Sequence, residues 1–256
     1  MKKFTKRLTM IVAVLLSLVL LSSSIVSTTL AKYVVTKDVT ANLQLQKFGL
    51  TVDLKVDEKL NPETKDIGNS AVVTIENFML KPGDNFSNAI TASISGKPNV
   101  DANVTIDVTV SCDDNNFKVL KDDFDGISAI TKDTIYTPVG FFVGGTNVIA
   151  SYKTYTVSTT KTTVLAEAIE AALTTKIATN AGNGLTRNTT TNVITGTLDA
   201  ETITEPISMT NLGIGFAWDD SNTSSTNAYQ EIGTYISDKY TPTFTITYKI
   251  TVEQAS

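Results

Sequence analysis

Apolar and polar residues alternate along much of this chain, and the first alternating stretch follows an apolar N-terminal run. From Tyr33 to Leu45 most apolar side chains lie on odd positions, which is the period-2 pattern of a strand with one buried face. From Phe48 to Val56 they lie on even positions. A one-residue slip exchanges the two faces of a strand, so the sequence predicts a bulge or break at Lys47-Phe48-Gly49.

The same alternation predicts further strands at 71–76, 90–94, 100–110, 212–218 and 244–252. Turn residues separate these segments. Glycines occupy the second face of the 212–218 strand, so we expect another segment to lie close against it. The charged segment 57–69, which contains Pro62 and Gly68, is predicted to be a loop.

A helical pattern occupies residues 163–179, where Leu165, Ile169, Ala172, Leu173 and Ile177 form one stripe. Thr163 is the expected N-cap, and Gly182 follows the end. We expect this helix to belong to an insertion, 158–205, that packs on one edge of the sheets and protects it from unwanted pairing. The rest of the insertion, 183–205, reads as a surface hairpin. A shorter helix is predicted at 227–237.

About nine strands with turns every eight to twelve residues, and one or two short inserted helices, indicate an all-β fold. The specific expectation is a jelly-roll-like β-sandwich. The chain is long enough for one such domain with a substantial core.

The N-terminal residues 1–31 have the composition of a secretory signal peptide. Basic residues precede an apolar run from Met10 to Leu21, and Thr29-Leu30-Ala31 is a small-x-Ala cleavage site. Cleavage between Ala31 and Lys32 would leave one sandwich domain, 32–256. A retained membrane anchor is the competing interpretation, although the run is short for a span.

Composition excludes several classes of function. The four basic residues of the signal leave 17 Lys and Arg against 26 acidic residues, a net charge of −9, which disfavours nucleic acid as a partner. The chain has no histidine, so Ser-His-Asp catalysis and His-ligated zinc are excluded. We therefore predict no catalytic residues, no metal site and no cofactor.

Three features remain as candidate chemistry, each with a structural alternative. The single Cys112 is either an exposed thiol for intermolecular pairing or a small buried apolar residue at the end of the 100–110 strand. The acidic turns 113–116 and 122–126 are either a calcium site or solvated turns, and their spacing does not match a calcium loop. The only tryptophan, Trp218, is either a stacking surface for a ligand or a core anchor.

Several motifs together resemble the TasA/camelysin family of secreted proteins from Gram-positive bacteria, which have a SipW-type signal peptide. These are the signal junction at 27–33, the turn Leu80-Lys81-Pro82-Gly83-Asp84, and the segment 216–220 followed by a short helix and a Thr-rich final strand that ends at 250–254. The middle of the chain, including the helix at 163–179, matches nothing in that family.

The resemblance implies a jelly-roll subunit that assembles into extracellular fibres of a biofilm matrix. It implies that a signal peptidase frees the N-terminus, and that the freed strand completes the sheet of the next copy. The candidate donor strand is 32–46. Its alternate side chains would fill pockets of the acceptor: Tyr33, Val35, Val39, Leu43 and Leu45.

The partners then expected are further copies of the chain, other matrix or cell-wall components, and the signal peptidase during export. The membrane is expected to be a partner only through the uncleaved signal, and the location is the extracellular matrix or the cell surface. Two alternatives stay open: a monomeric binding module for a glycan or a surface protein, and a camelysin-like peptidase, which the absence of histidine disfavours. An ordinary first strand paired within its own sandwich is the alternative to strand donation.

Overall fold

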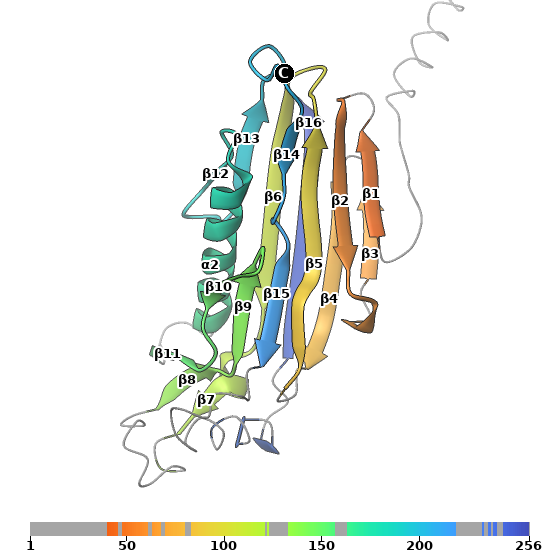
Figure 1. Cartoon of the computed structure of the whole chain (residues 1–256). Helices are drawn as coiled ribbons and strands as arrows, with labels where there is room; N and C mark the ends of the chain where they lie inside the picture. The colour runs from red at the N-terminus through yellow and green to blue at the C-terminus, as the bar shows by residue number, and fades with distance from the viewer. Residues whose placement is uncertain are drawn as a thin grey trace, which may run out of the picture. The chain divides into compact units, whose positions relative to one another are not determined.

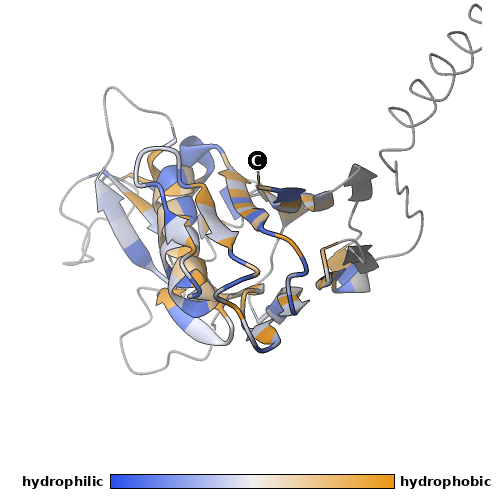
Figure 2. Cartoon of the chain, turned by 90° about the horizontal axis from the view of Figure 1, so that it is seen from above, coloured by the Kyte–Doolittle hydropathy of each residue, from blue (hydrophilic) through white to orange (hydrophobic). Residues whose placement is uncertain are grey.

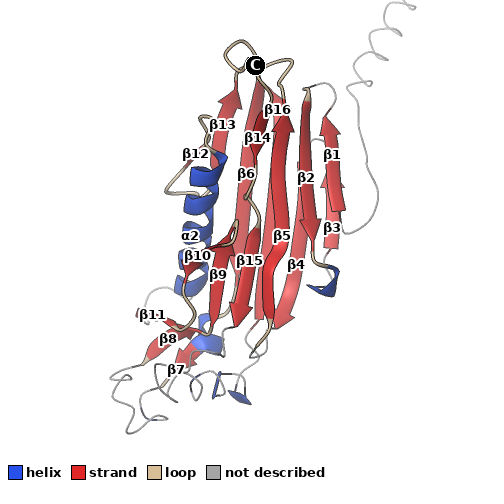
Figure 3. Ribbon diagram, in the orientation of Figure 1, coloured by secondary structure: helices blue, strands red, loops and turns tan. Residues whose placement is uncertain are grey.

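The computed structural model of the chain describes one compact part, within Val35–Ser256. The described residues are 40–45, 48–60, 63–67, 70–79, 83–120, 122, 133–156, 163–218, 232, 235–236, 238–239 and 243–255. The predicted signal peptide, 1–31, lies outside them. Most of the described residues belong to antiparallel strands, so the expected all-β class is confirmed (Figure 3).

The first layer is a seven-stranded sheet, sheet A (Figure 1). Its order is β1 (Thr40–Leu45), β2 (Leu50–Val56), β5 (Asn85–Gly96), β15 (Ile214–Trp218), β9 (Val139–Val143) and β10 (Thr146–Ile149), with β14 (Ile207–Met209) also paired to β5. Every pairing in it is antiparallel.

The second layer is a six-stranded sheet, sheet B. Its order is β12 (Thr186–Arg187), β13 (Ile194–Leu198), β6 (Ala102–Ser111), β16 (Thr243–Gln254), β4 (Ser70–Met79) and β3 (Glu63–Ile67). A three-stranded sheet stands apart from both layers and consists of β11 (Lys153–Thr156), β8 (Thr134–Thr137) and β7 (Lys118–Val119).

The connections between the layers are those of a jelly roll. The chain alternates between sheets from β4 to β5, β6 and β9, forms the β9–β10 hairpin, and then alternates again through β13, β15 and β16. The order β4-β16-β6-β13 therefore faces the order β5-β15-β9-β10, which is the eight-stranded, two-Greek-key arrangement. Beyond this core, β2 and β1 extend sheet A, while β3 and β12 lie at the two ends of sheet B.

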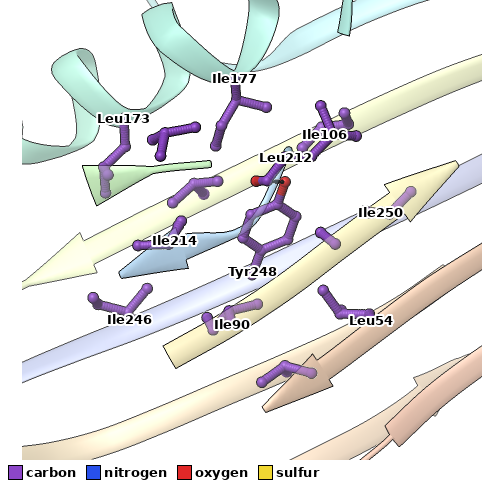
Figure 4. Close-up of a cluster of buried hydrophobic side chains, with 14 of the residues drawn as sticks. Leu54, Ile90, Ile106, Leu173, Ile177, Leu212, Ile214, Ile246, Tyr248 and Ile250 are labelled. Atoms are coloured by element: carbon purple, nitrogen blue, oxygen red, sulfur yellow. Dashed lines mark hydrogen bonds between the residues drawn. The ribbon is translucent and has the colours of Figure 1, made fainter. Parts of the chain in front are cut away.

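The apolar residues of the alternating pattern form the core between the two sheets. Along β16 and β6 the buried residues lie on even positions, as predicted, and Figure 2 shows the resulting bands of apolar and polar residues along the strands. The sheets meet through aromatic contacts: the rings of Phe78 and Phe216 stack with centroids 4.3 Å apart. Figure 4 shows the aliphatic part of this core around Tyr248.

The predicted helix is α2 (Val164–Ala181), and it closes one side of the sandwich. It contacts β6 and β12 of sheet B as well as β9 and β10 of sheet A, which confirms the expected edge position (Figure 1). Its buried residues are Leu165, Ala166, Ile169, Leu173, Thr174, Ile177 and Ala181. Thr163 is the N-cap residue, as predicted, but its side chain makes no capping hydrogen bond. Within the described segments, no helix is long and apolar enough to cross a membrane.

Two segments predicted as peripheral are parts of the sheets. The charged segment 57–69 contains a 3₁₀ turn, η1 (Glu58–Leu60), and the edge strand β3. The segment 183–205 does form a hairpin, β12–β13, but β13 continues sheet B by pairing with β6. The edge strand β3 was missed because its sequence, Glu-Thr-Lys-Asp-Ile, lacks apolar alternation. The hairpin was predicted, but its place in sheet B was not.

The short helix predicted at 227–237 is described only in part. Ile232 and Ile236 are helical and buried, and they pack with Val119 and Tyr136 of the three-stranded sheet.

The glycine-lined face of β15 is filled by the neighbouring strand. β5 carries a bulge opposite β15, between the pairs Ile214–Ile90 and Phe216–Phe86. A Cβ built on Gly215 would lie 2.0 Å from the carbonyl oxygen of Ser87. The segment expected to lie close against these glycines is therefore the β5 bulge.

We expect Gly215→Ala to lower the free energy of unfolding by about 2 kcal/mol or more, because the new methyl group would overlap backbone atoms that have little room to shift. Gly145→Asn is the control, since Gly145 has φ 77 with nothing within 4 Å of an added Cβ, and asparagine tolerates this region. Chemical denaturation measures both. Equal midpoints for Gly215→Ala and the wild type would contradict this account of the bulge.

Candidate functional site

The candidate donor strand occupies the end of sheet A. Its described part is β1, which is antiparallel to β2 with Thr40 opposite Lys55 and Leu45 opposite Leu50. Leu43 lies opposite Val52. The other proposed pocket-filling residues, Tyr33, Val35 and Val39, lie outside the described residues, as do Ala31 and Lys32 at the cleavage site. In the single chain this strand therefore pairs within its own sandwich.

The turn between β1 and β2 confirms the predicted change of phase. Gly49 has φ 68, and a Cβ there would lie 2.1 Å from the carbonyl oxygen of Lys97. Phe48 is 4% exposed, and its carbonyl oxygen accepts a 2.9 Å hydrogen bond from the backbone N–H of Asn99. The turn is thus anchored on the β5–β6 connection from Phe48 onward.

The strands at the ends of the two sheets differ in their protection against pairing with other chains. Sheet B ends in β3, Glu-Thr-Lys-Asp-Ile, whose three charged residues oppose edge-to-edge association, and in the two-residue β12. The end of sheet A at β10 is four residues long and carries a register shift. By contrast, β1 is six residues long and uncharged, Thr-Ala-Asn-Leu-Gln-Leu. Among the end strands of the two main sheets that the structure describes, β1 is the one that best suits β-augmentation.

Two motifs of the resemblance meet in space. Of the turn at 80–84, Leu80, Lys81 and Pro82 lie outside the described residues, while Gly83 has φ 88. The Gly83 N–H donates to the Trp218 carbonyl oxygen at 3.2 Å, and the Trp218 N–H donates to the Asp84 carbonyl oxygen at 2.9 Å. The turn and the segment starting at 216 therefore form one structural unit.

Trp218 is a core residue. Its side chain is 2% exposed, and its indole N–H donates to the Tyr152 hydroxyl at 3.2 Å. This burial leaves no open ring face for a ligand, so the core-anchor interpretation holds.

The first acidic turn, 113–116, caps the N-terminus of α2. The buried carboxylate of Asp114 accepts hydrogen bonds from Val164 N–H at 2.7 Å and Leu165 N–H at 3.1 Å, so it caps α2 from a different segment. Burial raises the pKa of Asp114, and these two hydrogen bonds oppose the shift. Among the residues that the structure describes, no three His, Cys, Asp or Glu side chains are grouped as metal ligands. Most of the second turn, 122–126, lies outside the described residues.

No local pattern indicates the Asp114 cap, because helix-capping patterns are local and Asp114 lies 50 residues before Val164. A second interaction was missed for the same reason. Glu170 on α2 accepts a hydrogen bond from the Val110 N–H of β6, 60 residues away, at 3.4 Å.

Cys112 packs against the core and is partly buried. Burial raises its pKa to about 12, with additional contributions from the negative charges of Asp114 and Asp113. The thiolate is the reactive form, so this side chain is a poor partner for intermolecular disulfide exchange at neutral pH.

No family model matches this chain, and neither a curated protein nor a solved structure is significantly similar to it. The resemblance to the TasA/camelysin family is thus carried by the motifs quoted above.

We expect Cys112 in the folded protein to react with iodoacetamide at mildly alkaline pH on the order of a hundredfold more slowly than a free cysteine, because little thiolate is present. Mass spectrometry of the alkylated protein over time measures the rate. The same protein in denaturant is the control and should react at the free rate. Equal rates in both conditions would show that the thiol is accessible and ionised in the folded state.

Proposed function

We propose that this chain is a secreted structural protein whose copies associate into extracellular or biofilm-matrix fibres. Association occurs by donation of the N-terminal strand, residues 32–46, to the sheet of the next copy. The protein acts without cofactor and is not an enzyme. Its partners are other copies and, in a matrix, further wall or matrix components, with a signal peptidase acting during export.

The position and composition of β1 carry this proposal. The described part of the donor strand, β1, is uncharged and lies at the end of sheet A, so exchanging it leaves the central strands β5, β15 and β9 in place. Because Phe48 and Gly49 are fixed on the β5–β6 connection, the segment that precedes them is the part able to move as a unit.

Strand donation keeps the same backbone hydrogen bonds and changes only which copy supplies them. A donated β1 in the register Thr40–Lys55 to Leu45–Leu50 restores the original ladder on β2 of the next copy. Its side chains at alternate positions supply specificity. Since each copy both gives and receives a strand, the contact is head-to-tail, and an association that does not close produces a filament.

We expect mature protein starting at Lys32 to form filaments, and a variant starting at Lys47 to stay monomeric, because the second lacks the donated strand. Negative-stain microscopy and size-exclusion chromatography measure the difference. A Lys32 protein that remains monomeric at high concentration would contradict fibre formation and favour the binding-module alternative. Polymerisation of both forms would show that the N-terminal strand does not drive assembly.

A disulfide between β1 and β2 distinguishes strand donation from association of copies that keep their own β1. Gln44 and Thr51 are opposite each other in the β1–β2 register, and cross-strand neighbours have Cα separations that suit a disulfide. In a Cys112→Ser background, we expect oxidised Gln44→Cys/Thr51→Cys protein to form no filaments and to recover on reduction. Mixed single variants, Gln44→Cys with Thr51→Cys, should give interchain disulfides on a denaturing gel. Unimpaired filaments from the oxidised double variant would exclude strand exchange.

A further inference from the structure

The edge of β6 is only half covered by its neighbouring strand. On one side β16 pairs with β6 along its whole length, from Ala102 to Ser111. On the other side β13 pairs with it only from Ala102 to Ile106. In the part of the chain that the structure describes, the segment 107–111 therefore has no strand partner on that side, although it belongs to a central strand of sheet B.

Helix α2 takes the place of the missing strand. It contacts β6, and a carboxylate oxygen of Glu170 accepts the 3.4 Å hydrogen bond from Val110 N–H that a strand carbonyl would otherwise accept. Backbone groups of an antiparallel strand point to alternate sides, so Val108 presents its N–H and C=O to the same edge as Val110. The helix thus shields a short row of strand hydrogen-bonding groups.

Besides its buried apolar side chains, polar contacts to several neighbouring segments hold α2 in place along its length. At its N-terminus Asp114, which is 6% exposed, accepts from Val164 and Leu165. In the middle, Asn192 Nδ2 donates to the other carboxylate oxygen of Glu170 at 2.8 Å. Near the C-terminus, Asn180 Nδ2 donates to the Asn211 carbonyl oxygen at 2.7 Å. Of these contacts, the cap by Asp114 is the one made by a buried charge.

We infer that residues 107–111 of β6 form a latent docking edge for a second copy of this chain, which α2 keeps closed and Asp114 latches. The strand that fits is β1 of the second copy. Acidic residues belong to the segments around this edge: Asp107 on β6, where Lys249 of β16 lies opposite it, Asp113 and Asp114 after β6, and Glu167 and Glu170 on α2. These acidic residues repel acidic segments, whereas β1 is uncharged and of similar length, six residues.

This inference goes beyond the proposed function, since it requires no strand exchange. It predicts that α2 restricts association to the β1–β2 side of the sandwich. Releasing the helix would create a second contact on the α2 side of the sandwich, where β1 of another copy adds to the uncovered half of β6.

Hydrogen exchange tests whether Asp114 keeps α2 on this edge. In Asp114→Ala, we expect amide exchange to rise about fivefold or more in both 164–172 and 107–111, the change that follows the loss of a helix cap. Asp199→Ala is a matched control, because Asp199 also accepts two backbone hydrogen bonds, from Glu201 and Thr202, but within a local turn. Faster exchange in the helix with unchanged exchange in 107–111 would overturn the claim that α2 covers this edge.

Light scattering after size exclusion tests the docking edge, in the oxidised Gln44→Cys/Thr51→Cys background, where β1 cannot be exchanged. We expect Asp114→Ala to form concentration-dependent oligomers there, and Asp199→Ala to remain monomeric. Adding Asn42→Asp, which places a negative charge on β1 against this acidic edge, should abolish the oligomers. Oligomers that persist with Asn42→Asp would overturn β1 as the occupant, and a strictly monomeric Asp114→Ala protein would overturn the docking edge.

A second variant and a comparison of oxidised with reduced protein complete the test. If Asp114→Ala fails to fold, Glu170→Ala is the second variant. It leaves the helix cap intact and removes the acceptor of the Val110 N–H, and the same two measurements apply. If Asp114→Ala associates only when the disulfide is reduced, association occurs by exchange of β1 and the inference is overturned, while the proposed function stands. Association in the oxidised protein, without filaments from the wild type, would support the inference and contradict the proposed function.

Discussion

The insertion of β16 between β4 and β6 is the interaction on which the sandwich depends. Without this strand, sheet B would separate into a β3–β4 pair and a group of β6, β13 and β12. Its inward side chains are at most 2% exposed: Phe244, Ile246, Tyr248, Ile250 and Val252. Burying each such side chain contributes roughly 1.5–3 kcal/mol, so this one strand supplies a large part of the free energy that holds the two layers together.

Tyr248 adds a polar link to this apolar row. Its hydroxyl donates to the Leu212 carbonyl oxygen at 2.9 Å, which ties the centre of sheet B to the segment that enters β15 of sheet A (Figure 4). Complete burial raises its pKa well above the ordinary value, so the hydroxyl stays protonated and remains a donor. The same contact explains why a tyrosine is accepted in the centre of an otherwise aliphatic cluster.

The position of β16 at the end of the chain makes the fold strongly non-local. Ser70 of β4 and Thr251 of β16 are hydrogen-bonded through their hydroxyls at 2.7 Å although 181 residues separate them. Such pairings close large loops before they are stabilised, which slows folding. Until β16 is in place, the edges of β4 and β6 stay open, and a protein of this topology therefore needs other ways to protect them.

Features that depend on neighbouring residues could be predicted from the sequence, whereas contacts between residues far apart in the chain could not. Strands with one buried face, such as those at 102–111 and 243–254, were predicted from side-chain alternation. The turn at Gly49 was predicted because the apolar residues change there from odd to even positions. The helix 164–181 was predicted to within two residues at its C-terminal end. Its capping carboxylate, Asp114, was not predicted, because only the fold brings this residue to the start of the helix. The polar edge strand β3 was missed because its sequence lacks the alternation on which the other strands were recognised.

The protection of edges accounts for several features that otherwise look unrelated. Charges protect β3, shortness protects β12, a register shift accompanies the end of sheet A at β10, and a helix covers the open half of β6. Residues 32–256 carry a net charge of −9, so copies of this part of the chain repel one another, and contact between them is favoured where charge is absent. The β1 edge is such a place, and this contrast with the protected edges is the physical reason to propose self-association through the N-terminal strand.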